Sequence, residues 1–111
     1  MQDVNLRDIL NAMTAAALNS LGTSAKEVSD STQTEFEKIG QIVQTIVDKL
    51  ATGELKQDGA KILFDMQKNS ASGALLELKG LSELAVQKAI NAALDVAKDG
   101  FNKLVGFGLI G

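Results

Sequence analysis

The segment LSELAVQKAINAALDVAKDGFNKLV, residues 81–105, carries the most regular helical pattern in the chain. Small side chains recur at every fourth residue, and an aromatic ring completes the row: Ala85, Ala89, Ala93, Ala97 and Phe101. Residues four apart lie on one ridge of an α-helix, so these side chains share a face. The pattern predicts a long amphipathic helix over 81–105.

A ridge of alanines allows a second helix backbone to approach closely. That second helix belongs either to another subunit or to this chain's own bundle, since alanine is also simply the best helix former. We take the alanines of this ridge and Phe101 as candidate interface residues.

Three earlier segments, 3–21, 24–51 and 54–78, also space their apolar residues as helices do. Gly22 is a candidate C-cap for the first, and Ser24 and Glu27 have the spacing of a capping box at the start of the second. Thr52 and Gly53 end the second segment. Its apolar face approaches a heptad seam, at Val28, Thr32, Phe36, Ile39, Val43, Ile46 and Leu50.

The segment 54–78 has a weaker pattern, carried by Leu55, Ile62, Leu63 and Met66. Residues 69–73 are its poorest helix formers, and Gly80 is a second possible hinge. Two alternatives stay open: segments 54–78 and 81–105 are two helices, or they merge into one. A continuous helix over 54–105 would be about 78 Å long and would make an extended hairpin.

The chain has no proline to interrupt these helices. We therefore expect an all-α fold in one domain over residues 1–111. The architecture is an antiparallel helical bundle or a long helical hairpin of three to four helices, with no strands.

The C-terminal tail, residues 104–111, is apolar, uncharged and punctuated by glycine. Its large side chains are Phe107, Leu109 and Ile110. Three roles stay open for it: docking on a neighbouring subunit, insertion into a membrane surface, or covering the end of its own bundle. We include these three side chains among the candidate interface residues.

The residues that most often carry chemistry are absent, because the chain has no His, Cys, Trp or Tyr. The pair Asp95 and Asp99 has helical spacing, but Lys98 and Lys103 lie at pairing distance, as on a solvated face. We expect no catalytic residues, no cofactor and no metal site. The formal net charge of −3 argues against a nucleic-acid partner, which favours a basic face.

These observations predict a non-enzymatic structural or interaction protein that self-associates through helix faces into a homo-oligomer or ordered assembly. Another helical protein is the second possible partner. The alternative function is a membrane-active or lipid-binding protein that uses its apolar faces and tail. We expect neither a signal peptide nor a transmembrane helix, which predicts a cytoplasmic protein or one exported without a cleaved signal.

Overall fold

The computed structural model describes residues 5–23, 25–78 and 80–110. It contains four helices: α1 (Leu6–Leu21), α2 (Lys26–Ala51), α3 (Gln57–Leu76) and α4 (Glu83–Val105). No strand occurs in the described residues. The predicted fold class, an all-α helical bundle, is confirmed.

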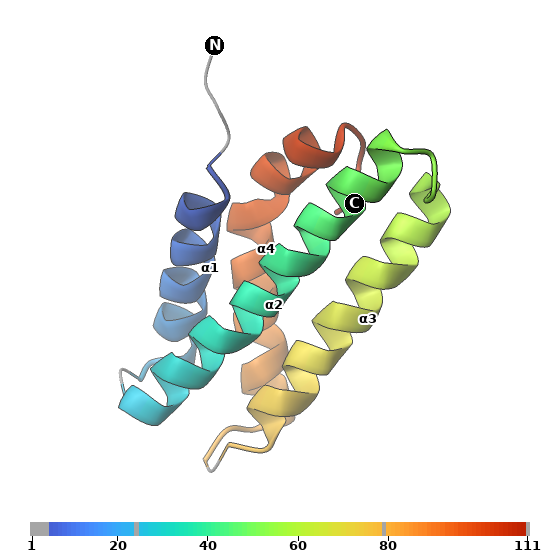
Figure 1. Ribbon diagram of the computed structural model, residues 1–111. Coiled ribbons are helices and arrows are strands. Elements are labelled where there is room, and N and C mark those ends of the chain that lie inside the picture. Colours follow the sequence, from blue (N-terminus) through green and yellow to red (C-terminus); the bar gives the residue numbers. More distant parts are fainter. Residues whose placement is uncertain (1–4, 24, 79, 111) are drawn as a thin grey trace.

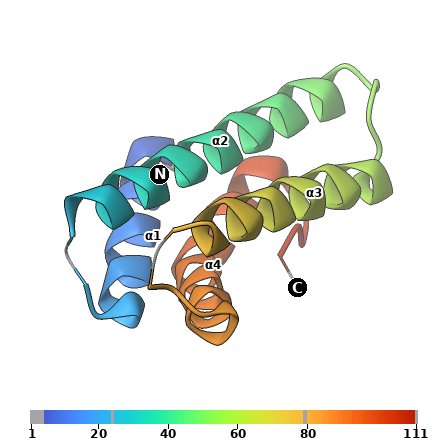
Figure 2. The ribbon, with the colours of Figure 1, turned by 90° about the horizontal axis from the view of Figure 1, so that it is seen from below.

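Consecutive helices run in opposite directions, as Figure 1 shows. α2 and α3 lie side by side in one layer, and α1 and α4 form a second layer across it (Figures 1 and 2). The most extensive helix pair joins α1 to α4, although they are the first and last helices along the chain. This pairing closes the bundle.

A sharp turn separates α3 from α4. Gly80 lies in this turn with φ +88°, a left-handed conformation that favours glycine. Ser82 then caps α4, its hydroxyl oxygen accepting a hydrogen bond from the Ala85 backbone N–H at 3.1 Å. Residues 69–73 stay helical within α3. The merged-helix alternative is therefore wrong, and the longest dimension of the molecule is only 43 Å.

The remaining helix ends follow local capping chemistry. Asn5 caps α1, its side-chain oxygen accepting from the backbone N–H of Arg7 at 2.9 Å and of Asp8 at 3.3 Å. Gly22 ends α1 with φ +70°, as expected of a C-cap. The predicted capping box rests on Ser24, which lies outside the described residues. α2 begins at Lys26, with Ala25 at the N-cap position and no side-chain cap.

The core lies between the two layers and receives side chains from all four helices. Its largest fully buried members are Phe36, Phe101, Met13, Ile39, Ile46 and Leu75. Phe64 of α3 meets Phe101 of α4 edge to face, with ring centroids 6.1 Å apart. The α2 face predicted from the heptad-like spacing does point inward, since Phe36, Ile39, Val43 and Ile46 are all buried.

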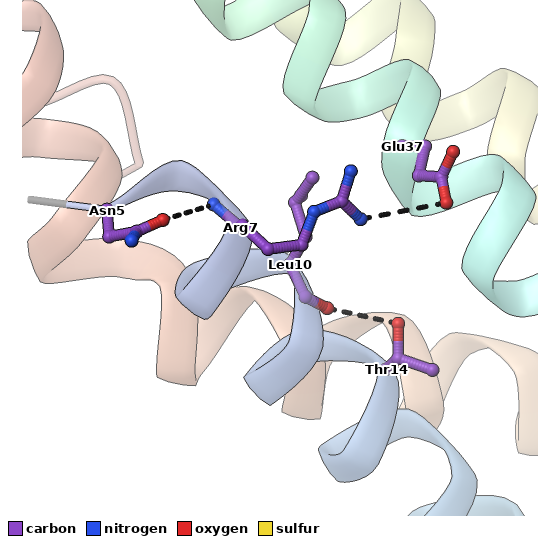
Figure 3. A network of polar contacts seen from close by, with 5 residues as sticks. All are labelled: Asn5, Arg7, Leu10, Thr14 and Glu37. Carbon is purple, nitrogen blue, oxygen red and sulfur yellow. Dashed lines mark hydrogen bonds and ion pairs between the residues drawn. The ribbon is translucent and has the colours of Figure 1, made fainter.

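α1 and α2 meet at a close crossing. A Cβ atom built on Gly40 would lie 2.8 Å from Cδ1 of Leu10, so the absence of a side chain lets α1 approach. Beside this crossing, Arg7 reaches from α1 to Glu37 of α2, with 3.7 Å between Nη1 and Oε1 (Figure 3). Both side chains are well exposed, so this ion pair adds at most about 1 kcal/mol.

Candidate interaction surface

The alanine ridge faces the interior of the chain's own bundle. Ala89, Ala93, Ala97 and Phe101 have no exposed surface, and Ala85 is half-buried. The neighbour of α4 across its longest interface is α1. This corrects the assignment of the ridge to a surface for another subunit: its buried members form an intramolecular contact, which was the second alternative.

The C-terminal tail folds back onto its own bundle. Gly106 turns the chain with φ +83°, and Leu109 is buried in the core cluster. The side-chain Nδ2 of Asn102 donates to the Ile110 carbonyl at 3.1 Å, and its Oδ1 accepts from the Ile110 N–H at 2.9 Å. The prediction of Leu109 as an interface residue is therefore corrected, because its side chain packs inside its own bundle. Phe107 and Ile110 are half-buried.

α3 is the least enclosed of the four helices. It packs along α2 and, less extensively, against α4, and it has no contact with α1 in the described part of the chain. Its buried residues are Ala60, Phe64, Ala71 and Leu75. In Figure 1, α3 lies at an edge of the molecule, and no other described segment covers its outer side.

The side of α3 that faces away from the core carries an exposed, uncharged seam. Its members follow one another at steps of four, three, four and three residues: Ile62, Met66, Asn69, Gly73 and Leu76. We call this set the outer stripe. Ile62 is 61%, Met66 62% and Leu76 41% exposed. Such spacing keeps side chains on one seam of a helix, as the a and d positions of a coiled coil do.

Charged groups stand beside the outer stripe rather than on it. Between residues 62 and 76 the only charged side chains are Asp65 and Lys68. They lie 3.8 Å apart, nitrogen to oxygen, and neutralise each other along one flank. The seam itself therefore presents apolar side chains, an amide and backbone to the outside, and carries no charged group.

A shallow groove adjoins the outer stripe where α3 meets α4. It holds about 280 Å³ and shares Asn69 and Leu76 with the stripe. Val86 and Ile90 are its buried apolar members, and amide side chains at Gln87 and Asn91 line the α4 side. Lys68 and Glu83 also line the groove, so it is more polar than the outer stripe that it adjoins.

The outer stripe was not predicted as a site. The sequence pattern grouped Ile62 and Met66 with the apolar residues of the segment, yet both side chains point outward. The inward face is formed by Phe64 and Leu75 together with Ala60 and Ala71. The usable signal was the position of Phe64, because it lies on the side of the helix opposite Ile62 and Met66.

Electrostatic features elsewhere are modest. The pKa of the exposed Lys26 ammonium is raised, first by its hydrogen bond to Asp30 and then by the charge of that carboxylate. Asp95 and Asp99 are exposed on α4. Within the described residues, no three acidic side chains gather closely enough to hold a metal ion.

A bilayer-spanning helix needs about 20 predominantly apolar residues, and no helix within the described ranges meets that requirement. No protein-family model matches the sequence. Neither the curated proteins nor the solved structures gave a significant match.

Proposed function

We propose that this protein is a non-enzymatic structural or interaction protein that self-associates into a homo-oligomer, with the outer stripe of α3 as its contact surface. The observation that carries this proposal is the clustering of exposed apolar side chains. Of the five large hydrophobic residues exposed in the described chain, three belong to the outer stripe. They share an uncharged seam with coiled-coil spacing, which suits packing against another helix.

The expected association is favourable but weak. Fully burying an exposed Ile, Leu or Met side chain is worth roughly 1.5–3 kcal/mol. One helix face is smaller than the roughly 800 Å² per partner of a standard interface, and association loses rotational and translational freedom. We therefore expect a dissociation constant on the order of tens to hundreds of micromolar.

A second protein copy suits this surface better than a lipid bilayer does. Interfacial membrane helices set a broad apolar face against a polar face rich in Lys and Arg. The outer stripe is narrower, contains Asn69 and Gly73, and is flanked by acidic as well as basic side chains. The apolar tail, the other candidate membrane element, has Leu109 buried in the core.

Sedimentation equilibrium from low micromolar to millimolar concentration tests the proposal. The unmodified chain is expected to show a reversible rise in average mass. The variant Met66→Glu places a charge in the middle of the seam and is expected to weaken association at least about tenfold, because the carboxylate must be desolvated.

Val96→Glu is the matched control, since Val96 is 51% exposed on α4 and lies outside the groove beside α3. Its association should equal that of the unmodified chain. A strict monomer at millimolar concentration overturns the proposal. So does a monomer that co-sediments with anionic phospholipid vesicles, which would favour the lipid-binding alternative.

A further inference from the structure

We propose that two copies of this chain pair through α3 in an antiparallel arrangement, with Ile62 opposite Gly73 of the second copy and Met66 opposite its Asn69. This inference rests on the proposed function and specifies its partner and geometry. It comes from the order of large and small residues along the outer stripe, from Gly73, and from the flanking charges.

Gly73 lies in the last quarter of α3, still inside the helix, and no contact within the described chain requires glycine there. Its backbone is not in the left-handed region. A Cβ atom added there would meet no atom of the described residues within 4 Å, so none of the four helices needs the space. An interior helical glycine costs about 1 kcal/mol relative to alanine. A partner side chain seated above Gly73 accounts for the open position.

When a second copy of the outer stripe runs in the opposite direction, its smaller residues lie opposite the large residues of the first copy. The first half of the stripe carries two large apolar residues, Ile62 and Met66, and the next two positions are Asn69 and Gly73. In each pair the two residues are four apart. A single antiparallel register therefore brings Ile62 over Gly73 and Met66 beside Asn69 at the same time, as a and d positions meet in antiparallel coiled coils.

The residues on the two sides of the outer stripe are compatible with the same register. Along one flank, Asp65 of each copy comes nearest to Ser72 of the other. Along the opposite flank, Leu63 comes nearest to Ser70. Lys68 of one copy lies level with Lys68 of the other along the first flank, but each Lys68 is paired with its own Asp65 at 3.8 Å. No unpaired like charges therefore face one another, which would be destabilising. A parallel, in-register pair would instead stack Gly73 on Gly73 and leave a gap at that layer.

The chain has no native cysteine, so every disulfide that forms between two variants joins the introduced cysteines. Ile62→Cys and Gly73→Cys are prepared separately, mixed and equilibrated in a glutathione redox buffer. Ile62 is exposed and Gly73 has open space around it, so both variants are expected to fold. The two variants differ in mass, so intact mass spectrometry distinguishes the mixed dimer from either self-dimer.

The mixed disulfide dimer is expected to exceed both self-dimers at least tenfold. In the proposed register the two Ile62 positions lie about 16 Å apart along the helix axis, too far for a disulfide, which needs Cα atoms within about 7 Å. Val96→Cys, mixed with either variant, is the control and should cross-link only at background level.

The outcomes separate this inference from the proposed function. Dominant self-dimers of each variant would show a parallel pair and overturn the register. A chain that self-associates in sedimentation but forms no stripe disulfide above the Val96→Cys background would overturn the α3 pairing while leaving self-association intact. A monomer in sedimentation removes both proposals.

Discussion

Asn102 holds the end of the described chain with both polar atoms of its side-chain amide. One atom donates to Ile110 and the other accepts from it, so the tail gains a two-point attachment. This attachment lies one residue beyond Leu109, whose side chain reaches the core. Asn102 therefore stabilises a hydrophobic contact that it does not itself make.

The substitution Asn102→Ala is expected to lower the free energy of unfolding by about 1–2 kcal/mol, because two hydrogen bonds are lost and Leu109 is held less firmly. Urea denaturation followed by circular dichroism measures the change. Hydrogen exchange at the Ile110 amide should accelerate in parallel. Asn91→Ala, at an exposed position of the same helix, is the control and should change stability by less than about 0.5 kcal/mol. Equal effects of the two substitutions would contradict this role.

At the scale of elements, the close approach of α1 and α4 depends on small side chains from both helices. Ala89, Ala93 and Ala97 of α4 and Ala17 of α1 are all fully buried. Alanine adds little bulk between two backbones, so the interhelical distance is short, and there is little room for a larger side chain.

Ala93→Leu is accordingly expected to destabilise the protein by about 1–3 kcal/mol, even though leucine is a good helix former, because three added carbon atoms must fit a packed interface. Chemical denaturation gives the value. Ala12→Leu inserts the same atoms at an exposed position of α1 and should change stability by less than about 0.5 kcal/mol. A neutral Ala93→Leu would mean that this interface contains unfilled space.

The sequence predicted the buried face of α2 well and that of α3 poorly, for one physical reason. In α2 the large apolar side chains of Phe36, Ile39 and Ile46 lie on the buried face, so hydrophobic spacing finds the core. In α3 much of the buried face is alanine, whereas Ile62 and Met66 are exposed. Hydrophobicity alone therefore selects the wrong side of that helix.

The contact surfaces could also be predicted only in part from the sequence. The alanine ridge and the apolar tail were recognised as contact surfaces, but spacing along a chain does not say which partner covers them. Long-range packing decided the matter: α1 covers one side of α4, and Asn102 ties the tail to the bundle. The outer stripe could be identified only from the structure, as the apolar seam of α3 that no other described helix covers.

At the scale of the whole molecule, net charge opposes association while the outer stripe favours it. Each copy carries a formal charge of −3. Two copies therefore repel weakly at long range, and salt screens that repulsion. Apolar burial across the stripe is not screened, because it involves no ion pair.

Self-association is therefore expected to stay constant or strengthen slightly as sodium chloride rises from about 50 mM to about 500 mM. Sedimentation equilibrium at several salt concentrations checks this, with the Met66→Glu variant as the non-associating reference. Weakening by tenfold or more across that range would point to contacts between opposite charges, and the outer stripe would then not be the main contact.

The pairing of the first helix with the last has a consequence for biosynthesis. α1 emerges from the ribosome before the other three helices, but its most extensive partner, α4, is the last of the four to be made. Until then Met13 and Ala17, both fully buried in the finished fold, lack the helix that covers them. The nascent chain can close its α2–α3 hairpin early, since neighbouring segments meet fastest. Completion of the bundle waits for the final helix, and the exposed face of α1 is the surface that a chaperone would meet during translation.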